Sequence, residues 1–93
     1  MPEVSRFFGI IISLNYNEHP PPHFHVRYND QRALVDIESL RLLEGHLSPR
    51  ALGMVIEWAS RHQVELKTNW GLVQSGVNKP IVKPEGVYPD RST

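Results

Sequence analysis

The first third of the chain alternates apolar and polar residues with the period of two that is typical of β-strands. Residues 6–16 are rich in Phe, Ile and Leu, and one face of this segment is wholly apolar; it carries Phe8, Ile10, Ile12, Leu14 and Tyr16. The other face is mixed, as in a sheet that helices cover on one side. We therefore expect residues 6–16 to form the first strand.

Two further strands are predicted for residues 23–28 and 32–38, with a turn at residues 29–31. Asn29 and Asp30 favour a turn because their side chains bond to their own backbone and tolerate a left-handed conformation. A turn this tight makes the two strands an antiparallel hairpin. Residues 40–45 fit either a fourth short strand or an irregular crossing.

The second half of the chain has apolar residues at helical spacing, namely Leu52, Val55, Ile56, Ala59, Leu66, Trp70 and Val73. Ser48 and Pro49 mark a helix start, with serine as the N-cap and proline at the first helical position. One straight helix over residues 49–75 would be about 40 Å long. A domain of this size has a radius of gyration of only about 11 Å, so we expect a break near residues 60–63.

These elements predict an α+β fold, in which a three- or four-stranded antiparallel sheet is followed by two C-terminal helices packed on one face. We expect residues 1–76 to form a single compact domain. Residues 77–93 contain three prolines and little periodicity, which predicts an extended or disordered tail.

Composition narrows the class of protein. The apolar fraction is 40% and the charged fraction 22%, which suits a soluble globular domain. Ten basic residues balance ten acidic ones, so the chain lacks the broad positive field of a general nucleic-acid binder. The absence of cysteine excludes disulfides, thiolate metal sites and cysteine nucleophiles. No apolar run approaches the roughly 20 residues that span a bilayer. We expect a cytoplasmic protein without a membrane partner.

The candidate chemistry is concentrated in residues 17–25, Asn-Glu-His-Pro-Pro-Pro-His-Phe-His. The three prolines predict a stiff, extended rod. Because strand side chains alternate between faces, His23, His25 and Arg27 share one face, and core packing of the hairpin brings Asp36 to that face too. Glu38 follows Asp36 on the same side.

Three interpretations of this face remain open. His23 or His25 could transfer a proton while Arg27 stabilises a phosphate and Asp36 orients an imidazole, as in a metal-independent ribonuclease that needs no cofactor. Alternatively, His19, His23 and His25 ligate a divalent metal such as Zn, with Asp36 or Glu38 completing the set. The third interpretation is a solvent-facing strand with ordinary Arg–carboxylate pairs. His46 and His62 are interpreted as structural.

The sequence also resembles a family of small bacterial proteins, the domain of unknown function 4160. The resemblance covers roughly residues 1–76, and its most specific part is the histidine–proline motif of residues 17–25. The extra Pro20 occupies the position between His19 and Pro-Pro and leaves this motif intact. The other matches are Ser5 to Ile10, Ala33 to Glu38, Gly45-x-Leu47, Glu57-Trp58-Ala59 and Asn69-Trp70.

Proteins of this family are similar to short cytoplasmic proteins often encoded beside a second small protein, an arrangement that resembles toxin–antitoxin pairs. The resemblance thus implies a small protein partner and a toxin-like role directed at nucleic acid, such as RNA, or at translation. A homo-oligomer and a non-enzymatic binding or regulatory module are the alternatives. The positions that carry over are His19, His23 and His25, and the resemblance does not establish their chemistry.

Overall fold

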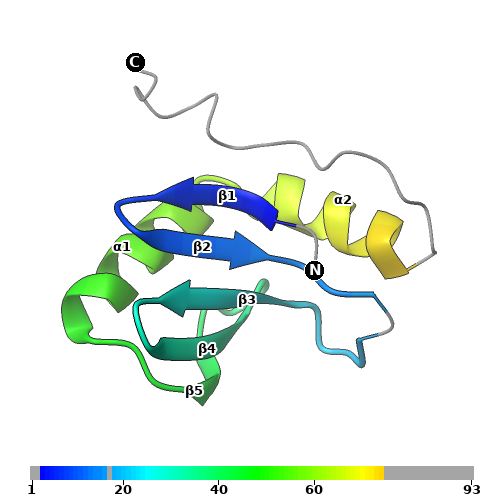
Figure 1. The fold of residues 1–93 in the computed structure, drawn as a ribbon. Helices are drawn as coiled ribbons and strands as arrows, with labels where there is room; N and C mark the ends of the chain where they lie inside the picture. The colour runs from blue at the N-terminus through cyan, green and yellow to red at the C-terminus, as the bar shows by residue number, and fades with distance from the viewer. Residues whose placement is uncertain (1–2, 17, 75–93) are drawn as a thin grey trace.

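A computed structural model of the chain describes residues 3–16 and 18–74. Within these residues, five strands form one antiparallel sheet in the order of the sequence, and two helices follow (Figure 1). The predicted α+β fold with two C-terminal helices is confirmed, with five strands in place of three or four. The elements are β1 (Glu3–Phe7), β2 (Ile10–Ser13), β3 (His23–Tyr28), β4 (Gln31–Asp36), β5 (Leu42–Gly45), α1 (Pro49–Ser60) and α2 (Gln63–Gln74).

The predicted first strand is in fact a hairpin of β1 and β2, so that expectation was wrong. The chain reverses at Phe8 and Gly9, whose φ angles are 50° and 81°. A two-residue turn with positive φ at both positions matches the twist of a tight hairpin, and glycine adopts it without steric cost. Phe8 is consequently exposed at the tip, whereas Ile10, Ile12 and Leu14 are buried as expected. An apolar run without Asn or Asp hides this turn, and Gly9 is its only marker.

The β3–β4 hairpin forms as predicted, and its turn includes Asn29 with a φ of 56°. Its register places Phe24 opposite Val35 and Val26 opposite Ala33, and all four side chains are buried. Because side chains alternate along a strand, the residues between them project from the other face of the sheet. This second face is the open face, on the side away from the helices.

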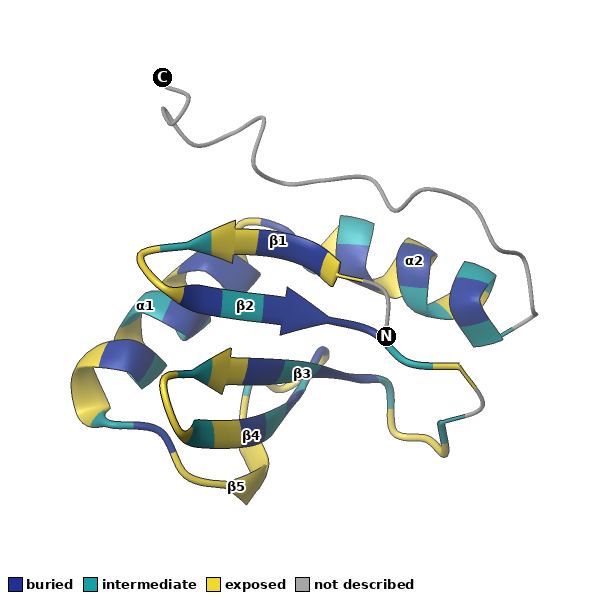
Figure 2. Ribbon diagram, viewed as in Figure 1, coloured by how far each residue is buried: buried dark blue, intermediate teal, exposed yellow. Residues whose placement is uncertain are grey.

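Residues 40–45, which the sequence left ambiguous, include the edge strand β5. Gly45 has a φ of 86°, and a Cβ atom at this position would lie 2.1 Å from the carbonyl oxygen of Arg32. Only glycine therefore allows β5 to approach β4 so closely. All four residues of β5 are exposed (Figure 2).

The helices cover one face of the sheet, and the predicted break between them occurs at residues 61–62 (Figure 1). The Ser48 side chain caps α1 by accepting a hydrogen bond of 3.3 Å from the backbone nitrogen of Ala51. The Trp58 ring stacks on Phe7 of β1 with 5.6 Å between ring centroids. The buried apolar helix residues join the strands in one core (Figure 2); they are Ala51, Val55, Trp58, Ala59, Leu66 and Val73.

The predicted proline-rich tail, residues 77–93, and the predicted domain boundary at residue 76 lie outside the described residues. Among the residues that are described, neither helix combines the length and the apolar character that crossing a membrane requires.

Candidate metal centre

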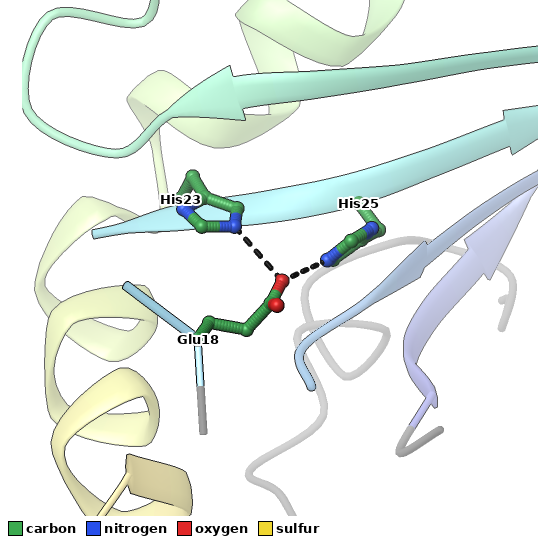
Figure 3. Close-up of side chains that lie close together, drawn as sticks. All are labelled: Glu18, His23 and His25. Carbon is green, nitrogen blue, oxygen red and sulfur yellow. Dashed lines mark hydrogen bonds and ion pairs between the residues drawn. The ribbon is translucent and has the colours of Figure 1, made fainter. Parts of the chain in front are cut away.

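Two imidazole rings from β3 and one carboxylate from the β2–β3 loop meet at the end of the sheet (Figure 3). The Nε2 atom of His23 lies 2.9 Å from Oε1 of Glu18, and the Nε2 atom of His25 lies 2.5 Å from the same oxygen. The ring centroids of the two histidines are 5.5 Å apart. The strand period thus places both rings together, and a loop residue supplies the carboxylate between them.

The ring of His23 is fixed in one orientation. Its Nδ1 atom lies 2.8 Å from the carbonyl oxygen of Pro21, and because a carbonyl oxygen can only accept, Nδ1 carries a hydrogen and donates it. The ring also packs against Trp70 of α2, with 5.1 Å between centroids, and His23 is only 7% exposed. The outward Nε2 atom of His23 is therefore aimed at Glu18 by contacts on the other sides of the ring.

The loop that carries Glu18 is held by the last residue of α2. Gln74 accepts a hydrogen bond of 2.7 Å from the backbone nitrogen of Glu18 and donates one of 2.7 Å to the carbonyl oxygen of Asn15. The stiff, extended proline rod predicted for this loop does not form, because the chain bends at Pro20 and Pro21. A contact from the far end of the second helix thus determines where the carboxylate lies.

The surroundings of Glu18 favour its ionised form. The hydrogen bond with His25 lowers the pKa of the Glu18 carboxyl below its ordinary value; partial burial opposes this effect, and the hydrogen bond with His23 reinforces it. Glu18 is therefore a carboxylate at neutral pH and can only accept hydrogen bonds.

The donors and acceptors at this site do not balance when both imidazoles are neutral. Since Nδ1 of His23 holds its hydrogen, the neutral ring presents a lone pair at Nε2 toward the Glu18 oxygen. His25 is different, because its Nε2 atom can carry the hydrogen of the neutral ring and donate it to the Glu18 carboxylate at 2.5 Å; the amide nitrogen of Asn15 lies 3.1 Å from the same atom. The lone pair on Nε2 of His23 then faces an anionic oxygen. A positive species between them, either added protons or a metal ion, relieves the repulsion.

Two of the residues proposed from the sequence lie elsewhere on the sheet. Asp36 is directly opposite His23 in the register, but its Oδ1 atom accepts hydrogen bonds of 2.7 and 2.9 Å from the backbone nitrogens of Glu38 and Ser39. It therefore holds the turn after β4 rather than an imidazole. Arg27 is exposed on the open face, two residues beyond His25 along β3.

The carboxylate of the site is one that the sequence prediction missed. His19, proposed as a ligand with His23 and His25, is exposed, and the residues with converging ligand atoms are Glu18, His23 and His25. The sequence did offer a signal, because Glu18 is the only acidic residue within the histidine–proline motif. The prediction named the neighbouring His19 as the third ligand instead, because imidazole is the commonest metal ligand in proteins.

The three ligand atoms fit a small divalent ion. They all lie within 4.8 Å of one another. Zinc is bound by imidazole nitrogen and carboxylate oxygen at about 2.0–2.2 Å, which separates tetrahedral ligand atoms by roughly 3.4 Å. The Glu18–His23 and Glu18–His25 contacts, at 2.9 and 2.5 Å, are shorter than that separation, so both would widen on binding. A hydrogen bond from the ring nitrogen that does not face the metal, of the kind that His23 makes to the carbonyl oxygen of Pro21, is the usual means of orienting a metal-binding imidazole.

The fold and the site define a small α+β protein with a two-histidine, one-carboxylate centre at the end of its sheet. The family model for the domain of unknown function DUF4160 matches residues 9–71, which is more than half of the chain and includes this centre. The chain therefore belongs to the DUF4160 family. Neither the curated proteins nor the solved structures contain a match to it.

Proposed function

We propose that Glu18, His23 and His25 bind a divalent transition-metal ion and that the protein uses it in hydrolysis. The observation that supports this proposal is the approach of two imidazole nitrogens to one carboxylate oxygen, with a lone pair fixed toward it on at least one ring. Imidazole and carboxylate together suit zinc, manganese and ferrous iron. The ligands come from a strand and an adjoining loop, so folding assembles them before any ion arrives.

The number of ligands favours a catalytic over a structural role. Structural zinc sites have four protein ligands, whereas catalytic sites have three and keep a position open for water or substrate. An ion held by these three residues would lower the pKa of a bound water and so would supply a nucleophile at neutral pH. His25 is about one-quarter exposed, so the site is open on its side. His23 is nearly buried and anchors the opposite side.

Metal content and affinity test this proposal directly. The protein is prepared without a histidine tag, loaded with zinc or manganese, and measured by elemental analysis and by competition with a chromophoric chelator. We expect one tightly bound ion per chain in the wild type and none in E18Q, H23A or H25A. His46 is exposed outside the site, so H46A is the matched control and keeps its ion.

Circular dichroism establishes that each variant remains folded. A wild-type chain that stays empty under metal-replete conditions overturns the proposal. An equal loss of metal in H46A and H25A also overturns it, because binding would then be non-specific.

The second candidate is the metal-independent ribonuclease expected from the sequence. A proton on Nε2 of His23 satisfies the same contact with Glu18 and leaves an imidazolium beside a second imidazole, which are the two partners of acid–base catalysis. Cleavage of a labelled RNA is therefore measured with zinc and with excess EDTA. Activity that persists in EDTA and is lost in H25A favours acid–base chemistry, whereas activity that requires added metal favours the metal centre.

We further propose a toxin-like role in a two-gene module with a small protein partner, which rests on the resemblance of the family to such modules. Induced expression of the wild type alone should arrest growth, and co-expression of the neighbouring gene should relieve the arrest. H25A should be harmless yet still bind the partner. Growth arrest that is unchanged in H25A would instead favour a non-enzymatic binding module.

A further inference from the structure

The open face of the sheet carries a row of side chains that the metal centre does not use. The register aligns Arg6 of β1, Ile11 of β2, Arg27 of β3 and Arg32 of β4 directly across four strands. Directly paired residues project from the same face, so three guanidinium groups and one isoleucine lie side by side there. The helices cover the opposite face (Figure 1).

The central two arginines form a like-charge pair. Arg27 and Arg32 are direct cross-strand partners, a position at which equal charges repel. Within residues 3–16 and 18–74, neither makes an ion pair with a carboxylate, whereas Arg6 is bonded to Glu3 at 2.9 Å. Arg61 likewise pairs with Glu57, at 3.0 Å. Two adjacent arginines that repel one another are suited to an anion that binds both.

These arginines line a groove of about 490 Å³, a volume typical of sites for small organic ligands. Ile11 and Leu34 contribute apolar surface to it, and Glu44 contributes a carboxylate. His25 also lines the groove. The same imidazole that contacts Glu18 in the metal centre is therefore a wall of the groove, so a ligand lying along the open face reaches the centre.

We infer that the open face of the sheet binds a phosphate-bearing ligand through Arg27 and Arg32 and presents it to the centre at His25. This inference deepens the proposed hydrolytic function, on which it rests, by naming phosphate esters as the substrate class. Guanidinium is planar and donates paired hydrogen bonds that match the oxygens of a phosphate. Two such groups side by side can grip one phosphate or two successive phosphates of a strand.

The neutral charge of the whole chain is consistent with a local site of this kind. A general nucleic-acid binder spreads positive charge over its surface. Here Arg27 and Arg32, which make no ion pair within the described residues, line the groove together with His25 and two carboxylates, Glu3 and Glu44. With only two or three phosphate contacts, binding should weaken modestly with salt, and less steeply than in proteins that contact many phosphates.

Binding is tested with a short fluorescein-labelled oligoribonucleotide by anisotropy, and with AMP and inorganic phosphate by calorimetry. The double variant R27Q/R32Q should bind the oligoribonucleotide about 100-fold more weakly than the wild type, since it loses two charge-assisted contacts and each is worth about tenfold in affinity. The matched control R50Q/R61Q removes the same charge from α1 and from the residue that follows it, on the covered side of the sheet, and should bind as the wild type does.

The probes also separate the two sources of a phosphate. Arginine-dependent binding of AMP assigns the groove to free nucleotides, whereas arginine-dependent binding of the oligoribonucleotide alone assigns it to an RNA strand; either result supports the inference. An equal loss of binding in R27Q/R32Q and R50Q/R61Q overturns it, and so does a wild type that binds none of the probes.

Metal analysis on the same samples distinguishes failure of this inference from failure of the proposed function. R27Q/R32Q should retain its metal ion, because neither arginine contacts Glu18, His23 or His25. If the wild type binds metal but none of the probes, the inferred phosphate site is wrong and the proposed metal centre stands. If the wild type binds the probes through its arginines but takes up no metal, the groove is an anion-binding site and the proposed metal-dependent function is wrong.

Discussion

The described part of the chain contains two histidine–carboxylate clusters, and the difference between them supports the proposal that the one at the end of the sheet binds metal. His62 lies between α1 and α2, is 2% exposed, contacts Glu65 through Nδ1 at 2.5 Å and packs on Trp58 with 5.2 Å between ring centroids. One imidazole there has one carboxylate of its own. At the end of the sheet, His23 and His25 share a single oxygen of Glu18.

The contrast lies in whether the histidine–carboxylate contact needs an added cation. A neutral His62 ring can donate from Nδ1 to its own carboxylate, so that contact forms without any ligand, at the corner between the helices. Two imidazoles directed at one oxygen are complete only when a cation joins them. The number of imidazoles that share one carboxylate is therefore a better indicator of a candidate metal site than the presence of a histidine–carboxylate contact.

The largest expected effect is the loss of metal binding in H25A. Removing a ligand should weaken zinc binding by more than about 100-fold, because even changes to outer-shell partners cost roughly 10–100-fold. Competition with a chromophoric chelator measures the affinity. Zinc affinity within a few fold of the wild type would remove the distinction between the two clusters.

The reciprocal variant H62A should keep its metal and lose stability. Replacing this buried imidazole leaves a cavity beside Trp58 and a carboxylate without its partner, which together cost about 2–3 kcal/mol. Urea unfolding of the metal-free protein measures the change. H46A, at an exposed position, should change stability by less than about 0.5 kcal/mol. If H62A lost its metal while remaining folded, the two clusters could not be independent.

Two glutamines on α2 sharpen the comparison further. Gln74 holds the backbone of Glu18 and Asn15, so Q74A should weaken metal binding about tenfold without touching a ligand. Gln63, at the start of the same helix, donates to the carbonyl oxygen of Ile37 instead. Q63A should therefore lower stability and leave the metal affinity unchanged. Metal titrations and urea unfolding of both variants distinguish positioning of the site from general support of the fold.

The smallest effect concerns the arginines, which show the same contrast between satisfied and unsatisfied charges. R27Q removes one of two like charges that face each other and should raise the free energy of unfolding by about 0.2–1 kcal/mol at low salt. R61Q removes a charge that is paired with Glu57 and should lower it slightly. Urea unfolding at low and high salt checks both signs. A lower stability of R27Q would mean that Arg27 makes a stabilising contact in the fold.

Much of the fold could be predicted from local patterns. The β3–β4 hairpin, the Ser48 cap and the break between the helices follow from alternation, turn residues and helix signals that act over a few positions. The turn at Phe8 and Gly9 could not be predicted in this way, because a continuous apolar run fits one buried strand as well as two. The antiparallel pairing of β1 with β2 shows that the run forms two strands.

The candidate site was only half predictable for the same reason. Alternation along one strand predicted that His23 and His25 would share a face. It could not predict which carboxylate would join them, because both the preceding loop, which contains Glu18, and the next strand, which contains Asp36, are close enough along the chain to reach the histidines. Asp36 is the direct partner of His23 across the sheet, yet it bonds to the turn that follows its own strand.

The sequence alone determined the α+β class, the paired histidines of β3 and the absence of thiolate chemistry, since each depends on residue type and on spacing within one element. The tertiary structure alone decided that Glu18 completes the centre and that Arg27 faces Arg32. Gln74 holds the Glu18 loop from 56 positions further along the chain. Contacts between distant segments depend on how whole elements pack together, and no local pattern of residues encodes that packing.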